Sequence, residues 1–258
     1  MCIRDRSLRQ SRFYKQARVI YRGWRYRMKV ERQEVLFLLN HLGPGQTAID
    51  IGAHRAAFCY WMAKRIGPTG TILAFEPLPQ LAGYLREVKE CLPMPQMRVI
   101  EAALANEPGQ ATLNVPVSSY LGTTTLLPLD EHSEPITVET MRLDDYCQEH
   151  RIASVNFIKC DVEGFELEVF QGGERTLREH HPVLLFECED DRHNDGQHRR
   201  VFPFLESLGY EGFFFRGGKV LPLSEFKPEY HQRGDRDWSN NFGFVSSERR
   251  SARLPHAA

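Results

Sequence analysis

The segment Ala48-Ile49-Asp50-Ile51-Gly52-Ala53-His54 has the pattern of a buried strand that runs into a tight glycine turn. A helical segment follows at 55–66, and a second apolar strand follows that helix at 71–75. Strands that alternate with helices of this length are typical of βαβ units and a parallel sheet. Because ligands bind at the carboxyl ends of the strands in such sheets, the turn predicts a nucleotide-binding edge.

The same alternation continues along most of the chain. We expect seven strands, at 47–52, 71–75, 97–102, 155–160, 183–187, 210–215 and 241–246. We expect helices at 55–66, 79–91, 143–150, 164–179 and 197–208. Two extended pieces between the third and fourth strands, 111–116 and 136–141, indicate a β-hairpin insertion. The predicted fold is therefore α/β, with a mostly parallel seven-stranded sheet flanked by helices.

The composition excludes several classes of protein. Of 258 residues, 41% are hydrophobic and 26% are charged, which is ordinary globular usage and not that of a disordered or collagen-like chain. The six cysteines are scattered without a Cys-x-x-Cys pair, which favours reduced thiols over a disulfide framework or a zinc site. No apolar run approaches the roughly 20 residues that cross a bilayer. We therefore expect a cytoplasmic protein.

Charge is distributed unevenly. Residues 1–36 contain eleven Lys/Arg and three Asp/Glu, which is a net charge of +8. Because the whole chain has a net charge of −1, the remaining residues have a net charge of −9. We interpret 1–36 as a basic amphipathic extension, 37–248 as the main domain and 249–258 as a disordered tail. The oligomeric state is not predicted.

The extension has the 3.6-residue period of a helix. One face carries the apolar stripe Phe13, Ala17, Ile20, Trp24 and Met28. The other face carries Lys15, Arg18, Arg22, Arg25 and Lys29. We favour packing of the apolar stripe on the main domain. Docking to an anionic membrane surface, to nucleic acid or to an acidic partner is the alternative. Of these we expect peripheral membrane contact rather than nucleic acid.

The turn lacks the glycines of a dinucleotide site. A G-x-G-x-x-G fingerprint needs three glycines, and only Gly52 is present. The turn instead carries Asp50, which suits a cationic or hydrogen-bond-donating ligand. Glu76 ends the second strand, where a carboxylate can accept both hydroxyls of a ribose. Two acids without phosphate-binding glycines favour a nucleoside without phosphates, with S-adenosylmethionine as the leading candidate, although an ordinary strand-to-helix turn remains the alternative.

A second cluster of charges ends the fourth strand. Lys159, Asp161 and Glu163 share one side of an extended segment, because side chains alternate with a period of two. Unpaired charges are costly to bury, so packing alone does not explain them. A structural pair of lysine and carboxylate that caps the next helix is the alternative. The fifth strand brings Glu187 to the same edge.

These motifs together resemble a known family. The segments that carry the resemblance are Asp50-Ile51-Gly52-Ala53, Phe75-Glu76-Pro77, Leu143-Asp144-Asp145, Lys159-x-Asp161-x-Glu163-Gly164-x-Glu166 and Phe186-Glu187. In this order, over about 45–247, they resemble the FkbM family of S-adenosylmethionine-dependent methyltransferases. The family turn usually reads Asp-Val-Gly-Ala-Asn-x-Gly, whereas this chain has His54 at the asparagine and Ala56 at the second glycine.

The resemblance implies a class I methyltransferase sheet with a last antiparallel strand. It also implies methyl transfer to a hydroxyl oxygen, usually on a sugar, glycolipid or natural product. Cofactor contacts are expected from Asp50, Gly52, His54, Glu76 and Ala103.

Methyl transfer is an in-line displacement, in which a base assists loss of the hydroxyl proton. Asp161 is our first candidate for the carboxylate beside the methyl acceptor. Glu163 and Glu187 come next, and Lys159 is expected to orient these carboxylates. No metal ligand set is predicted, although a divalent cation held by these carboxylates is an alternative to a base. The rival functions are a nicotinamide-dependent oxidoreductase and a nucleic-acid or membrane binding module that uses the basic helix.

Overall fold

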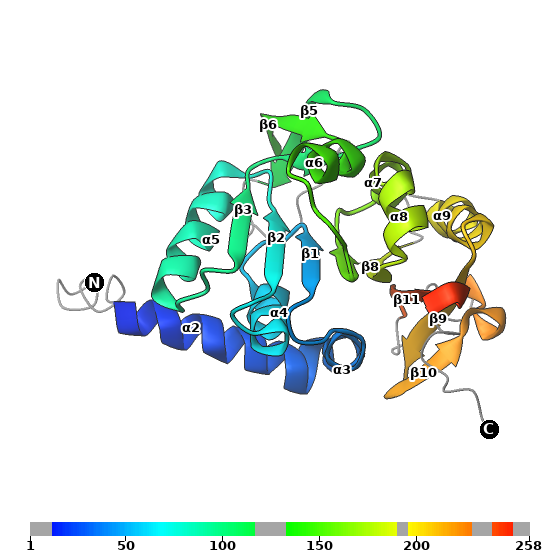
Figure 1. The fold of residues 1–258 in the computed structure, drawn as a ribbon, viewed down its shortest axis with the longest axis horizontal. Coiled ribbons are helices and arrows are strands. Elements are labelled where there is room, and N and C mark those ends of the chain that lie inside the picture. The colour runs from blue at the N-terminus through cyan, green and yellow to red at the C-terminus, as the bar shows by residue number, and fades with distance from the viewer. Residues whose placement is uncertain (1–11, 117–132, 190–195, 229–238, 250–258) are drawn as a thin grey trace.

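The computed structural model describes residues 12–116, 133–189, 196–228 and 239–249 (Figure 1). Residues 250–258 of the predicted tail lie outside these ranges, as do residues 1–11 of the predicted extension. No helix within the described ranges is long and apolar enough to span a membrane.

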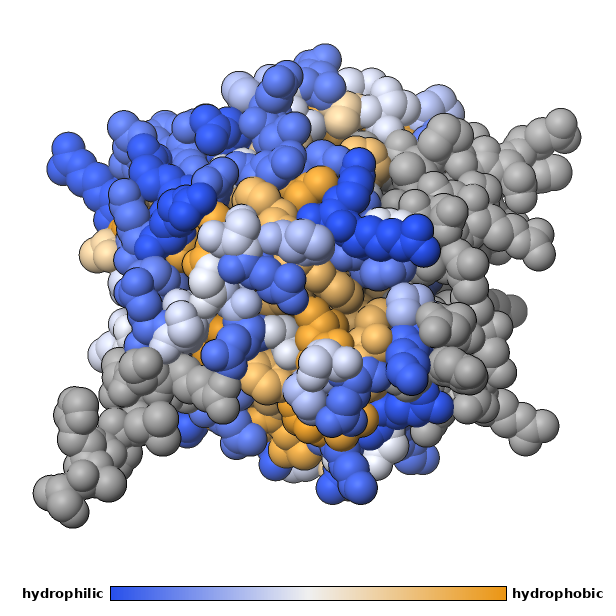
Figure 2. All heavy atoms as spheres, turned by 90° about the vertical axis from the view of Figure 1, so that its right-hand side faces the viewer, coloured by the Kyte–Doolittle hydropathy of each residue, from blue (hydrophilic) through white to orange (hydrophobic). Residues whose placement is uncertain are grey.

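The centre of the molecule is an eight-stranded sheet with the order β10-β9-β11-β8-β7-β1-β2-β3 (Figure 1). The strands are β1 (Thr47–Ile51), β2 (Thr71–Phe75), β3 (Met97–Ile100), β7 (Phe157–Cys160), β8 (Val183–Glu187), β9 (Tyr210–Arg216), β10 (Lys219–Pro222) and β11 (Asn241–Ser246). All seven predicted strands are present. The eighth, β10, forms an antiparallel hairpin with β9 at the edge. On the side of the molecule that Figure 2 shows, hydrophobic surface is interrupted by hydrophilic side chains.

The sheet is mostly parallel, as predicted. β1 lies between β2 and β7 and is parallel to both, whereas β11 is antiparallel to β8 and β9. Parallel strands that helices cover on both faces are buried along their length, which explains their continuous apolar sequences. This order brings the carboxyl ends of β1, β2 and β7 to one edge of the sheet.

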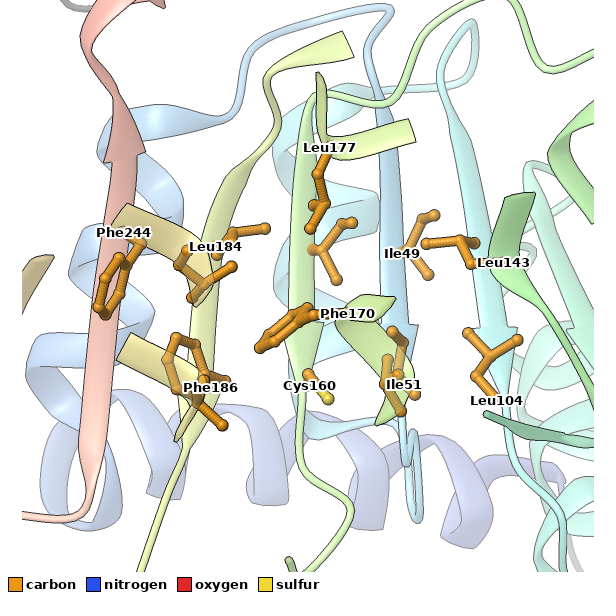
Figure 3. Close-up of a cluster of buried hydrophobic side chains, with 14 of the residues drawn as sticks. Ile49, Ile51, Leu104, Leu143, Cys160, Phe170, Leu177, Leu184, Phe186 and Phe244 are labelled. Atoms are coloured by element: carbon orange, nitrogen blue, oxygen red, sulfur yellow. The ribbon is translucent and has the colours of Figure 1, made fainter. Parts of the chain in front are cut away.

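Helices cover both faces of the sheet. They are α2 (Arg12–Arg25), η1 (Tyr26–Val30), α3 (Arg32–His41), α4 (Ala57–Ile66), α5 (Pro79–Cys91), α6 (Leu143–Glu149), α7 (Glu166–Gly172), α8 (Glu174–His180) and α9 (Gln197–Ser207), with a short 3-10 turn at Leu223–Glu225. On one face Ile49, Ile51 and Phe186 pack against Phe170 and Leu177 of α7 and α8 (Figure 3). The other face packs against α3, α4 and α5.

The predicted helix at 164–179 is divided into α7 and α8. At Gly172 the chain lies so close to the backbone of Ala105 that an added Cβ would be 2.1 Å from its carbonyl oxygen. The second helix is capped by Asp144, whose carboxylate accepts hydrogen bonds from the backbone N–H of Arg175 and of Thr176, at 3.0 and 2.8 Å. Asp144 therefore has a structural role in this fold.

The predicted insertion is a β-hairpin of β5 (Gly109–Pro116) and β6 (Ser133–Met141), to which β4 (Ala103–Leu104) adds a third strand. Its apolar side chains Leu113, Val115 and Val138 pack against Leu78 and Leu81, which follow β2. The hairpin therefore covers the edge of the main sheet where β2 ends.

The expected packing of the basic helix is wrong. Most of the apolar stripe faces outward, with Phe13 80% and Met28 60% exposed, whereas Trp24 is 45% exposed and its ring packs on Trp61. The buried positions of α2 are Val19 and Gly23. The absence of a side chain at Gly23 brings α2 against α4, where an added Cβ would lie 2.6 Å from the Tyr60 ring. A close backbone approach, invisible to hydrophobic periodicity, therefore decides which face is buried.

Candidate active site

An open cleft lies at the carboxyl ends of β1, β2 and β7. It contains about 760 Å³ of space, part of it continuous with solvent. Six of the nine residues predicted for the site line this cleft, namely Gly52, His54, Glu76, Ala103, Asp161 and Glu163. Asp50, Lys159 and Glu187 do not line it. The topology thus brings together residues more than 100 positions apart in the sequence.

The glycine turn packs directly on the segment after β7. Gly52 has a φ of +73°, and a Cβ there would lie 2.0 Å from the carbonyl oxygen of Asp161. The N–H of Asp161 donates in turn to the carbonyl oxygen of Ile51 at 3.0 Å. Only glycine satisfies both the left-handed backbone and the close approach.

The two departures from the family pattern both fall on left-handed backbone. His54 has a φ of 46° and Ala56 a φ of 64°, at the positions where the family usually has asparagine and glycine. A left-handed conformation costs an ordinary L-residue about 1–2 kcal/mol, and asparagine and glycine tolerate it best. The turn of this chain therefore keeps the geometry that the family pattern implies, at a higher conformational cost.

Glu76 joins the ends of β1 and β2. Its carboxylate is 4% exposed and accepts hydrogen bonds from the backbone N–H of His54 at 2.8 Å and of Leu78 at 3.1 Å. Burial raises the pKa of Glu76 to about 7, although these two hydrogen bonds favour the ionised form. Each oxygen retains a second lone pair for a ligand in the cleft.

Lys159 holds Asp161 in position. The Lys159 ammonium donates to a carboxylate oxygen of Asp161 at 2.6 Å and is itself 4% exposed, above the ring of Phe58. Asp50 is its cross-strand neighbour and accepts a hydrogen bond from the Cys59 thiol at 3.0 Å. Burial alone would lower the pKa of Lys159, but the charges of Asp161 and Asp50 raise it, so the lysine is cationic. Asp50 and Lys159 lie behind the cleft and support Asp161, which lines it.

Two further carboxylates flank Asp161. Burial, reinforced by the charge of Asp161, raises the pKa of Glu163 to about 8 and also raises that of Glu187. Glu163 lines the cleft from a left-handed backbone with a φ of 49°. Glu187 ends β8, where the Asn240 amide donates to its carboxylate and to that of Glu189. Within the described ranges no three His, Cys, Asp or Glu side chains are grouped so as to hold a metal ion.

The sequence reasoning missed the apolar part of the cleft. Leu78, Leu81, Leu113 and Phe165 line it beside Ala103. The position of Leu78, two residues after Glu76, was a usable signal for a ligand wall. Leu113 had no such signal, since it reaches the cleft only through the packing of the hairpin. Apolar walls with a few convergent polar groups are typical of a small-molecule site.

The raised pKa values of buried carboxyl groups predict that the stability of the protein depends on pH. The ligand-free protein should become less stable as the pH rises from 4.5, the ordinary value for glutamate, through about 7 and about 8, the pKa values of Glu76 and Glu163. In this range the folded chain binds more protons than the unfolded chain, so the free energy of unfolding falls with pH. Chemical denaturation at a series of pH values measures this slope. A free energy of unfolding that rises across the range would contradict it.

A parallel sheet covered by helices on both faces, with an acidic cleft at the carboxyl ends of β1 and β7, is the arrangement of an α/β protein that binds a small ligand at the ends of its strands. The chain belongs to the FkbM methyltransferase family, because residues 50–211 match the family described as "Methyltransferase FkbM domain". It is therefore a methyltransferase, and the family implies S-adenosylmethionine as the methyl donor. This membership decides against the nicotinamide-dependent alternative.

Individual proteins agree with this membership. The chain is 30% identical over 212 residues to the 2-O-methyltransferase NoeI of Sinorhizobium fredii. The matched region covers 75% of this chain and 84% of that protein. The crystal structure of Methyltransferase FkbM from Methylobacillus flagellatus matches 90% of this chain and 55% of that one, with 15% identity and a TM-score of 0.51. Cofactor-bound Rv0187 from MTB matches 90% and 88% of the two chains, with 13% identity and a TM-score of 0.52. The two structures support the fold alone.

Proposed function

We propose that the chain transfers the methyl group of S-adenosylmethionine to a hydroxyl oxygen of a small molecule, sugar or glycolipid. The observation that carries this proposal is that Glu76 and Asp161, from two different strands, line the same cleft. The name of the relative NoeI, a 2-O-methyltransferase, supports oxygen as the accepting atom.

The cleft offers a complementary group for each part of the cofactor. Glu76 would accept hydrogen bonds from the ribose hydroxyls, because its fixed carboxylate keeps free lone pairs toward the cleft. Leu78, Leu113 and Ala103 form an apolar wall suited to the adenine ring. The turn at Gly52 and His54 would then face the methionine part. Asp50 does not line the cleft, and its carboxylate accepts the Cys59 thiol, so we assign it to the support of Lys159.

When bound, S-adenosylmethionine supplies an electrophilic methyl group on a sulfonium sulfur. Asp161 would orient the acceptor hydroxyl and take up its proton as the oxygen forms its bond to the methyl carbon and the sulfur keeps the electron pair of the broken bond. The Lys159 ammonium, at 2.6 Å, fixes the other side of the Asp161 carboxylate. Glu163 is the second candidate for the proton, with Glu187 behind it.

Glu76→Gln tests the cofactor site. We expect the affinity for S-adenosylmethionine to fall about ten- to hundredfold, since hydrogen bonds to a charged group contribute roughly 1.5–3 kcal/mol. Isothermal titration calorimetry measures the affinity. Glu101→Gln is the matched control, because Glu101 follows the neighbouring strand but pairs with Arg86 outside the cleft. Unchanged affinity in a Glu76→Gln protein with an unchanged melting temperature would refute the ribose assignment.

The wider organisation is also a proposal. All the cleft residues lie within 37–248, which supports treating this range as the catalytic domain and 1–36 as an extension. The five cysteines in the described ranges are buried and without disulfides, which supports a reducing, cytoplasmic setting.

A further inference from the structure

The outward surface of α2 and η1 is unusually apolar for a face turned to solvent. Its large side chains Phe13, Ile20, Tyr21, Trp24 and Met28 are all more than a third exposed. We call these five residues the outer face of α2. From Phe13 to Met28 they follow one side of the helix over a length of about 22 Å. Contiguous exposed apolar surface of this kind marks an interaction site.

Most contacts that attach α2 to the protein use other residues, and within the outer face only the Trp24 ring has such a contact among the described residues, edge to face with Trp61 at 5.2 Å between centroids. Lys15 pairs with Glu87 at 2.6 Å, and Arg22 donates to the carbonyl oxygen of Arg55 at 3.0 Å. The indole N–H of Trp61 donates to the carbonyl oxygen of Gly23 at 2.8 Å. Since these contacts hold the helix mainly through its inner side, the other four residues of the outer face are not required for that attachment.

The charge around the outer face has one sign. Residues 12–30 contain seven Lys/Arg and no Asp/Glu. Arg18, Arg25 and Lys29 are exposed on one flank of the apolar side chains, whereas Lys15 and Arg22 turn inward. Aromatic and aliphatic side chains with a cationic flank are the pattern of a helix that lies in the interface of a bilayer.

We infer that the outer face of α2 binds the surface of an anionic lipid bilayer. The apolar side chains would insert at the boundary between headgroups and acyl chains, and the flanking cations would meet lipid phosphates. A second copy of the chain fits less well, because a symmetric contact would oppose the same cations. Nucleic acid also fits less well, because the centre of the face is apolar. The inference is independent of the proposed function.

The helix that carries this face is attached next to the active site. Arg55, whose carbonyl oxygen holds the end of α2 through Arg22, directly follows His54 of the cleft. A bilayer bound to the outer face would therefore lie close to one end of the cleft.

Co-sedimentation of the full chain with vesicles tests the inference. We expect binding to vesicles of phosphatidylcholine and phosphatidylglycerol, little binding to phosphatidylcholine alone, and loss of binding at high salt. Phe13→Ser combined with Met28→Ser, and separately Arg18→Glu combined with Arg25→Glu, should each weaken binding at least about tenfold. Emission from Trp24 should shift to shorter wavelength with anionic vesicles, and the shift should be absent in Trp24→Phe.

Val220→Ser combined with Lys219→Glu is the matched control, since both residues are exposed on β10, away from α2. This control should bind vesicles as the unchanged protein does, and all variants should retain cofactor affinity by calorimetry. Absence of binding to anionic vesicles would overturn the inference, as would an equal loss of binding in the control. A dimer in sedimentation velocity that Phe13→Ser with Met28→Ser dissociates would assign the face to a second copy instead.

Discussion

Asp161→Asn should reduce turnover by about a hundredfold or more while changing the affinity for S-adenosylmethionine much less. Asparagine keeps the shape of the side chain and an oxygen for the Lys159 ammonium, but it cannot take up the hydroxyl proton. Asp161 lines the cleft beside the turn at Gly52, whereas the expected adenosine contacts lie toward Glu76 and Leu78. Single-turnover rates and calorimetry, measured on the same protein, separate the two effects.

Asp145→Asn is the matched control for this prediction, because Asp145 is exposed and lies outside the cleft. It should leave turnover unchanged. Near-normal turnover of Asp161→Asn together with a lowered melting temperature would return Asp161 to a structural pair with Lys159. Activity of the unchanged protein that a chelator abolishes would favour a metal ion over a base at this position.

Gly52→Ala should impair both folding and cofactor binding. The added Cβ would lie 2.0 Å from the Asp161 carbonyl oxygen, on a backbone with a φ of +73°. A left-handed alanine costs about 1–2 kcal/mol and overpacking costs about 1–3 kcal/mol, so a loss of at least about 2 kcal/mol in the free energy of unfolding is expected. Because the strands would separate at the cleft itself, cofactor affinity should fall at least about tenfold.

Gly83→Ala provides the comparison within the same fold. Gly83 lies inside α5 with open space around it and no left-handed backbone, so alanine should stabilise the protein by about 1 kcal/mol. Chemical denaturation and calorimetry of both variants give the contrast. A Gly52→Ala protein with the stability and cofactor affinity of the unchanged chain would contradict the close contact between the turn and the segment after β7.

The separation of roles among the acids follows from where each strand ends. Asp161 and Glu163 emerge beyond the last residue of β7 and therefore reach the cleft. Asp50 and Lys159 are the last residues but one of β1 and β7. They therefore lie inside these strands, where helices cover the sheet. Burial of this lysine is sustained by its carboxylate neighbours, since an isolated buried ammonium would be expensive.

The sequence by itself determined the seven strands, the hairpin insertion and the family. These features depend on local hydrophobic period and on motifs whose spacing is visible along the chain. The positions of Glu76 and Asp161 at the cleft were predicted in the same way, because a charged residue that ends an apolar strand is a local signal. The antiparallel last strand was implied by the family resemblance and is confirmed in β11.

Only the tertiary structure decided which face of α2 is buried, which side chains of the Lys159 segment reach the cleft, and how Leu113 enters it. Helical period marks an apolar stripe but does not say what it contacts, and here Gly23 brings the opposite side of the helix against Tyr60. Leu113 lines the cleft because the hairpin packs on Leu78 and Leu81. These features depend on close contacts between segments that are distant in sequence. Such contacts form only when the chain folds, so a local sequence pattern does not reveal them.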